Sequence, residues 1–175
     1  MISTIGHSTR TLEELVALLR GHAIATVVDV RTVPRSRRHP HFAKDALVES
    51  LPQAAIAYTH MPGLGGLRKP RKDSPNIGWR NEGFRGYADY MQTDDFARHL
   101  AALIALADTT RLAIMCAEAV PWRCHRNLIS DALVVRGVDV RHITGAAAPA
   151  PHVLTPWSRR DGVQLTYPAA QGELF

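Results

Sequence analysis

Short apolar segments alternate along this chain with longer segments of helical periodicity, and this alternation limits the possible folds more than any other feature. Five segments rich in apolar and β-branched residues predict strands at residues 3–6, 25–30, 56–59, 111–116 and 138–143. Apolar residues spaced three or four positions apart predict helices between them, at residues 11–21, 95–107 and 122–136, with a separate helical turn at 86–92. Strands that alternate with helices form parallel sheets with right-handed crossover connections. We therefore predict a single three-layer α/β domain with a mainly parallel, Rossmann-like sheet flanked by helices.

Local signals mark where the elements begin and end. Thr11 precedes Glu14 by three positions, which is the pattern of a capping box, and Gly21 is expected to end the same helix. Residues 61–84 contain many glycines and prolines and predict a long loop, which in a compact domain usually has a function. From Gly145 the sequence GAAAPAPH indicates a linker. We expect the α/β domain to span residues 1–144 and a linker with a C-terminal tail to span 145–175.

Composition excludes several classes of protein. The chain has 175 residues, enough for one domain with a substantial core. No segment approaches the roughly 20 apolar residues of a membrane span, and the first residues do not resemble a secretory signal. Two cysteines eight positions apart do not make a disulfide framework. We expect no membrane association and a reducing, cytoplasmic location.

The positive charge is concentrated in one part of the chain. Residues 31–85 contain eleven basic and four acidic residues, a local charge of +7, whereas the whole chain carries +5. A local excess of this kind is expected of a surface that binds phosphates or other polyanions. A basic surface that only aids solubility is the alternative.

Polar and reactive side chains follow the predicted strands. They are His7 and Ser8 after the first strand, Asp29 and Arg31 at the end of the second, His60 after the third, and Cys116 and Glu118 after the fourth. Because the carboxyl ends of parallel strands share one edge, where α/β sheets bind ligands, these side chains should line one pocket.

The segment CAEAVPWRCHR, residues 116–126, is the strongest candidate site. We expect a strand to end at Cys116 and a helix to begin at Pro121, with Arg123, His125 and Arg126 in its first turns. A helix N-terminus attracts anions and stabilises thiolates.

Cys116 has two interpretations. As a nucleophile, its thiolate would be stabilised by the helix N-terminus and by Arg123 or Arg126. Rhodaneses and cysteine phosphatases use a similar strand–Cys–loop–helix arrangement, but here six residues rather than five separate Cys116 from Arg123, the loop lacks glycine, and Glu118 would repel a phosphate. The alternative is a buried cysteine that acts as a small apolar residue.

The spacing of residues around Cys124 indicates its role and bears on whether the segment binds a metal. Cys124, Leu128 and Ala132 are four positions apart, which predicts a buried helix face. A redox pair of Cys116 and Cys124 requires the loop to fold the helix start back onto the strand end. The spacing Cys-x7-Cys-His does not match a known zinc pattern, so we expect neither a metal nor an organic cofactor.

Glu118 and His7 complete the expected catalytic set with Cys116. A carboxylate beside His7 or His125 could serve as a base or as the nucleophile of an N-glycosidic cleavage. Alternatively, Glu118 forms an ion pair with Arg31 or Arg123 and holds the pocket together.

Arginines and aromatic residues in the basic region suit nucleic acid, because guanidiniums bind phosphates and aromatic rings stack on bases. Packing of the long loop is the alternative role for Trp79 and Tyr87. The expected substrate- or phosphate-binding residues are Ser8, Arg31, Arg35, Arg37, Trp79, Arg80, Arg85, Tyr87, Arg123, His125 and Arg126.

The last five residues, QGELF, resemble the peptide that binds the bacterial sliding clamp. In such a tail Gln171 would make polar contacts while Leu174 and Phe175 enter an apolar pocket. Chance similarity, or a tail that folds onto its own domain, is the alternative.

Several segments together resemble the bacterial family named "domain of unknown function 488". They are TIGHSTRTLEELVALL, VVDVRTVPRSRR, GLGGLR, NEGFRGYADYM, CAEAVPWRCHR and LISDAL, in this order and up to about residue 154. The resemblance implies a small cytosolic α/β protein and supplies no reaction.

Three hypotheses follow from these observations. The first is an enzyme that acts on nucleic acid or a nucleotide at the strand-end pocket, in DNA repair or replication. The second is a non-catalytic adaptor between nucleic acid and the clamp. The third is a rhodanese-like thiol enzyme that uses Cys116 on a small anion.

Overall fold

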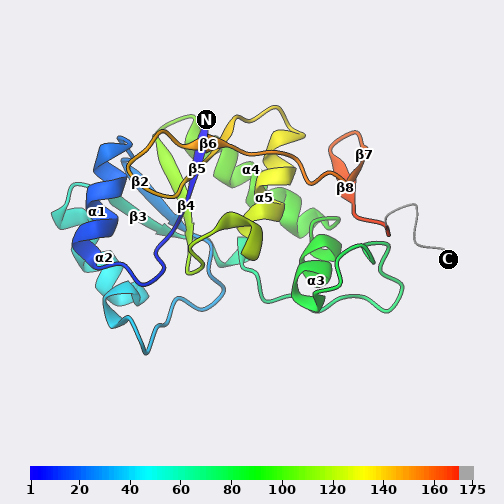
Figure 1. Cartoon of the computed structure of the whole chain (residues 1–175), viewed down its shortest axis with the longest axis horizontal. Helices are drawn as coiled ribbons and strands as arrows, with labels where there is room; N and C mark the ends of the chain where they lie inside the picture. Colours follow the sequence, from blue (N-terminus) through cyan, green and yellow to red (C-terminus); the bar gives the residue numbers. More distant parts are fainter. Residues whose placement is uncertain (170–175) are drawn as a thin grey trace.

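The computed structural model describes residues 1–169, which fold around a six-stranded sheet (Figure 1). The strands are β1 (Ile2–Gly6), β2 (Thr26–Asp29), β3 (Ala57–His60), β4 (Leu112–Cys116), β5 (Val140–Ile143) and β6 (Ala150–Pro151). Their order is β3-β2-β4-β1-β5-β6; the first five are parallel, and β6 is antiparallel to β5. The predicted α/β fold with a mainly parallel sheet is confirmed.

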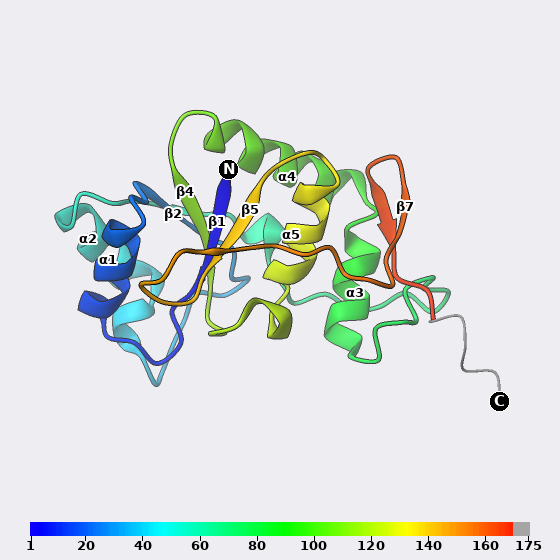
Figure 2. The same cartoon turned by 45° about the horizontal axis from the view of Figure 1, so that its top comes forward.

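Helices cover both faces of this sheet (Figure 2). They are α1 (Leu12–Gly21) and α2 (Lys44–Gln53) on one face, and α3 (Glu82–Tyr90), α4 (Asp94–Ala107) and α5 (Arg126–Val134) on the other. Alternate strand residues supply the two cores: Ile5 packs with α1 and α2, whereas Ile2 packs with α4 and α5. No helix within residues 1–169 has both the length and the apolar character needed to cross a bilayer.

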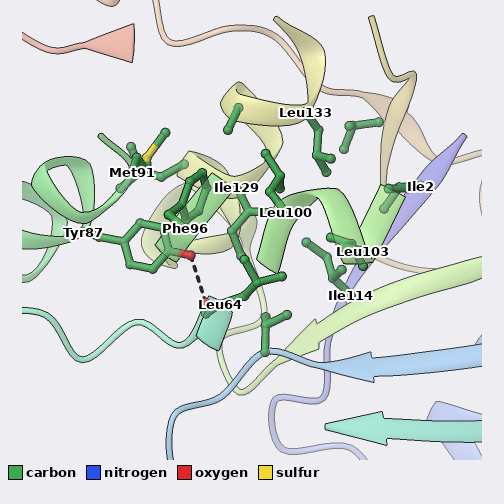
Figure 3. Close-up of a cluster of buried hydrophobic side chains, with 14 of the residues drawn as sticks. Ile2, Leu64, Tyr87, Met91, Phe96, Leu100, Leu103, Ile114, Ile129 and Leu133 are labelled. Atoms are coloured by element: carbon green, nitrogen blue, oxygen red, sulfur yellow. Dashed lines mark hydrogen bonds between the residues drawn. The ribbon is translucent and has the colours of Figure 1, made fainter. Parts of the chain in front are cut away.

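The larger core joins α3, α4 and α5 to the sheet (Figure 3). Tyr87 and Phe96 lie at its centre with almost no exposed surface. The Tyr87 hydroxyl donates to the carbonyl of Leu64 at 2.8 Å, which satisfies its polar group within the core and ties the long loop to α3.

The topology places a crevice at the carboxyl end of β4. The crossovers that follow β1 and β2 carry α1 and α2 on one face, whereas the crossover that follows β4 carries α5 on the other. Because β4 lies between β2 and β1, the chain leaves neighbouring strands in opposite directions here. Such a switch point leaves a ligand-sized crevice in open α/β sheets.

Helix boundaries follow the capping residues. The capping box of Thr11 and Glu14 is present as predicted. Asn81 caps α3 by accepting from the Phe84 amide, so the helical turn expected at 86–92 belongs to a longer helix. The helix expected from residue 122 begins later, at Arg126, because residues 121–123 form a 3-10 turn (η3, Pro121–Arg123) and Cys124 is extended.

The segment after Gly145 is integrated into the fold rather than forming a bare linker. It adds β6 to the sheet and forms a two-stranded hairpin of β7 (Arg159–Asp161) and β8 (Gln164–Thr166) beside α3 (Figures 1 and 2). Tyr167 is fully buried, and its hydroxyl donates to Asp131 of α5 at 2.8 Å. The clamp-like residues Gln171, Leu174 and Phe175 lie outside the described residues.

Candidate functional site

A cavity of about 360 Å³ opens at the carboxyl ends of β1, β2 and β4, at the predicted edge of the sheet. Loops from four regions of the chain form its wall. The lining residues are His7, Arg31, Thr32, Val33, Arg35, Ser36, Gly66, Leu67, Gly83, Phe84, Cys116, Ala117, Glu118, Arg123, Cys124 and His125. A volume of this size is within the range of small-ligand sites.

Two thiols and one imidazole meet in the cavity wall. The Nδ1 atom of His125 lies 3.6 Å from Cys124 Sγ and 4.0 Å from Cys116 Sγ, and all three atoms lie within 4.8 Å of one another. Both cysteines are free and buried. The late start of α5 causes this arrangement, because the 3-10 turn at residues 121–123 folds Cys124 back towards the end of β4. Cys124 is buried, as predicted, but it faces Cys116 rather than contributing to a helix face.

The tautomer of His125 follows from its second contact. Its Nε2 atom lies 2.9 Å from the carbonyl of Val30 at the end of β2, and a carbonyl only accepts, so Nε2 carries the proton. The lone pair of Nδ1 therefore points at the two sulfurs. The side of the ring is closed by Gly66, where a Cβ would lie 2.5 Å from Nδ1.

Arg126 places a buried positive charge beside this cluster. Its side chain is 1% exposed; Nε donates to Cys124 Sγ at 3.4 Å, and one terminal nitrogen donates to the carbonyl of Glu118. Within residues 1–169 no carboxylate forms an ion pair with this guanidinium. A buried charge needs compensation, so the sulfur cluster is suited to carry negative charge.

The two thiols respond to these surroundings in opposite ways. The hydrogen bond to Cys124, followed by burial, raises the pKa of Cys116. The hydrogen bond from Cys116 and the charge of Arg126 lower the pKa of Cys124, against the opposing effect of burial. If one sulfur of this pair ionises, it is Cys124, with Cys116 as the hydrogen-bond donor.

Arg31 and His7 are held in fixed positions at one side of the cavity. Arg31 binds both carboxylate oxygens of Asp29, at 2.9 and 2.5 Å, and donates to the carbonyl of Phe42. The remaining terminal nitrogen of Arg31 lies 3.3 Å from His7 Nε2. Burial, with the charge of Arg31, lowers the pKa of His7 to about 4, so this imidazole is neutral near pH 7. The predicted Arg31 is therefore largely engaged by Asp29 rather than free for an anion.

The free charges of the cavity lie at its rim. Arg35, Arg123 and Glu118 are all exposed. The ion pair expected between Glu118 and Arg31 or Arg123 is not formed, because no basic group within residues 1–169 lies within 4 Å of the Glu118 carboxylate. Val33, Leu67 and Phe84 are the large apolar side chains of the lining and make up its apolar wall.

Seven predicted substrate-binding residues do not line the cavity. These residues are Ser8, Arg37, Trp79, Arg80, Arg85, Tyr87 and Arg126. Tyr87 and Arg126 are buried beside the site. The Tyr87 ring packs against His125, and Arg126 donates to Cys124. Trp79 stacks on Phe84 at 4.9 Å, and its buried Nε1 has no hydrogen-bond partner among residues 1–169. Arg85 lies 3.6 Å from Glu82, Arg37 is exposed, and Ser8 has a positive φ of 52° at the turn after β1.

Sequence reasoning did not identify the apolar wall or the role of Cys124. Gly66 and Leu67 lie in the glycine-rich loop of residues 61–84, which the sequence predicts to be functional. The sequence does not indicate which residues of this loop contact the cavity. Cys124 directly precedes His125 in the sequence, but its position depends on where the helix begins.

Comparison with known proteins gives one family. The profile of the family described as "Domain of unknown function DUF488" matches residues 11–133, more than two thirds of the chain. No curated protein and no solved structure matches the chain at a significant level.

Proposed function

This chain belongs to the DUF488 family, to which no reaction is assigned, and we propose from its cavity that it is an enzyme acting on a nucleotide, free or within a nucleic acid. The observation that carries the proposal is the combination in one cavity of an apolar and aromatic wall, free guanidiniums at the rim and a cluster of reactive side chains. The location agrees with the general position of ligand sites in α/β sheets.

The shape and composition of the cavity suit a base with an attached phosphate. Phe84, whose ring also stacks on Trp79, lines the cavity together with Leu67 and Val33 and gives it apolar surface for a base. Arg35 and Arg123 are exposed at the rim and can bind phosphate oxygens in pairs. The excess positive charge of residues 31–85 would attract a polyanion towards the opening.

The reactive side chains have distinct roles in this proposal. Glu118 has no ion-pair partner within residues 1–169, so its carboxylate is available to accept a proton from a bound water. Neutral His7 is a hydrogen-bond partner rather than a cation. Cys116, Cys124 and His125 form the wall against which the substrate would lie.

The test is a screen of nucleotides and single-stranded oligonucleotides by thermal unfolding, followed by product analysis of those that bind. A ligand at about 100 times its Kd should stabilise the fold by about 2.7 kcal/mol. Glu118→Gln should abolish turnover while binding persists. Unchanged melting temperatures across the screen would rule out this substrate class.

Thiol chemistry is a second candidate, favoured by the lowered pKa of Cys124 beside His125 and Arg126. In this alternative the nucleophile would be the thiolate of Cys124, rather than that of Cys116 as the sequence suggests, and Arg123 would bind the anionic group of the substrate. The test is the rate of alkylation of each cysteine against pH, read by peptide mass. Alkylation of Cys124 only above pH 8 would eliminate it as a nucleophile.

A role as an adaptor between nucleic acid and the sliding clamp, in DNA repair or replication, is a further proposal. The clamp-like residues lie outside the described part of the chain, so the motif QGELF is the support for it. Binding to a bacterial sliding clamp that disappears when Leu174 and Phe175 become alanine would support it; equal binding by both proteins would remove it. A cytoplasmic location is likewise proposed from the sequence, whose two cysteines do not make a disulfide framework.

A further inference from the structure

We propose that Cys116, Cys124 and His125 bind one divalent metal ion of the zinc class. The three donor atoms lie within 4.8 Å of one another, and the distances from His125 Nδ1 to the sulfurs are 3.6 and 4.0 Å. Around a tetrahedral zinc with ordinary Zn–S and Zn–N bonds, a sulfur and a nitrogen ligand are separated by about 3.6 Å. Both sulfur–nitrogen separations therefore match those of a zinc site to within a few tenths of an ångström.

The orientation of His125 is that of a metal ligand. Its Nε2–H donates to the carbonyl of Val30, which fixes the ring and directs the Nδ1 lone pair to the sulfurs. Metal-ligating histidines usually donate their other ring N–H to a backbone carbonyl or carboxylate in this way. The Val30 carbonyl also comes from a different element than either cysteine, so the ring is held independently of them.

The charge around the sulfurs supports bound thiolates. The Arg126 guanidinium is buried, donates to Cys124 Sγ and forms no ion pair with a carboxylate in residues 1–169. Two thiolates neutralise a divalent ion and accept from this donor, and an anionic fourth ligand such as hydroxide would offset the charge of the guanidinium. The sequence predicted no metal because the spacing of these residues differs from that of a zinc knuckle. Here the ligands come instead from the end of β4 and from the residues that follow the 3-10 turn.

The ligand set indicates which metal and which kind of site. Two thiolates and one imidazole favour zinc over calcium or magnesium. Three protein ligands leave one position, and these residues line the cavity, so that position would face it. In that position zinc would supply a bound water that ionises near neutral pH. A catalytic use of this water rests on the proposed function, whereas the proposal that the three residues bind zinc does not.

The test is the metal content of the full chain, purified without chelators and after metal loading. We expect about one zinc per chain in the wild type. The zinc content should fall by more than about tenfold in Cys116→Ser, Cys124→Ser and His125→Gln. His39→Gln, a histidine outside the cavity, is the matched control and should keep its zinc.

Cobalt titration of the metal-free wild type keeps the test valid if the variants do not fold. We expect thiolate-to-cobalt absorption that saturates at one equivalent, and protection of both cysteines from alkylation. No absorption, full zinc content in the variants, or a Cys116–Cys124 disulfide in fresh protein would overturn the proposal. Nucleotide binding measured on the metal-free protein separates this failure from failure of the proposed function.

Discussion

At the scale of single residues, the site depends on contacts that the sequence indicates only in part. Cys116 and Glu118 were predicted at the pocket because strand ends of a parallel sheet converge, and this argument needs only the strand positions. His125 was predicted there because it lies in the first turns expected after Pro121. Cys124 was assigned to a helix face because periodicity cannot show that residues 121–123 form a 3-10 turn. Arg126 was expected to bind substrate. It is buried instead, because Cys124 is extended and α5 begins only at Arg126.

Gly66 provides a prediction at this scale. In Gly66→Ala the new methyl would lie 2.5 Å from His125 Nδ1, so the ring or the loop must shift. We expect a loss of about 1–3 kcal/mol in the free energy of unfolding and weaker binding of ligands to the cavity. Urea unfolding and ligand titration measure both effects. Gly145→Ala, where a Cβ meets no atom within 4 Å, is the control and should change neither; equal behaviour of the two variants would contradict the geometry.

At the scale of elements, one carboxylate joins the C-terminal segment to α5. Asp131 is fully buried and accepts from His152 Nε2, the Thr155 amide and hydroxyl, and the Tyr167 hydroxyl, at 2.7 to 3.0 Å. The sequence identified the helix that carries Asp131 but not these partners, which lie 21 to 36 positions away. Long-range polar contacts leave no periodic signal, so the segment was expected to be a linker.

Asp131→Ala should therefore be strongly destabilising. It removes the acceptor of four buried or half-buried donors, and each unsatisfied buried group costs about 1–3 kcal/mol. We expect a loss above about 3 kcal/mol in denaturant unfolding. Asp139→Ala removes an exposed ion pair with Arg141 and should cost less than about 1 kcal/mol. A loss as small as that of the control would show that Asp131 is not the link.

A chain of hydrogen bonds through His142 predicts a dependence on pH. Thr4 contacts His142 Nδ1 at 2.8 Å, and His142 Nε2 contacts His152 at 2.9 Å. Burial and the neighbouring His152 lower the pKa of His142 to about 4, from 6.5 in the unfolded chain. Below pH 6.5 the unfolded chain binds a proton that the folded chain does not, so stability should fall from pH 6.5 towards pH 4 and stay level above it. His142→Gln should reduce this slope, and an NMR titration midpoint near 6.5 would contradict the account.

At the scale of the whole molecule, the sheet and its helices could be predicted, but the extent of the domain could not. The five parallel strands follow from local apolar runs, each of which the structure retains. The family match ends at residue 133, whereas β5, β6 and Tyr167 complete the fold. Neither the linker-like sequence GAAAPAPH nor the family match, which ends at residue 133, indicates that residues 145–169 pack onto the domain.

A chain of residues 1–144 should therefore be unstable. It would lack Tyr167, Thr155 and His152, and would expose Asp131 and the core around Leu165. We expect no cooperative thermal transition for it, in contrast to the full chain. Calorimetry compares the two. Cooperative unfolding of residues 1–144 at the temperature of the full chain would restore the linker interpretation.

The central claim is that the strand-end cavity binds a nucleotide with its phosphate at the rim. The most direct measurement is the Kd of a nucleoside monophosphate, by calorimetric titration, for the wild type, Arg123→Ala and Arg37→Ala. Arg123 lines the cavity, whereas Arg37 is equally basic and exposed but lies outside it. We predict that Arg123→Ala weakens binding about tenfold, as expected for one charge-assisted contact, and that Arg37→Ala leaves it unchanged. Equal weakening by both variants, or no binding by the wild type, would contradict the account.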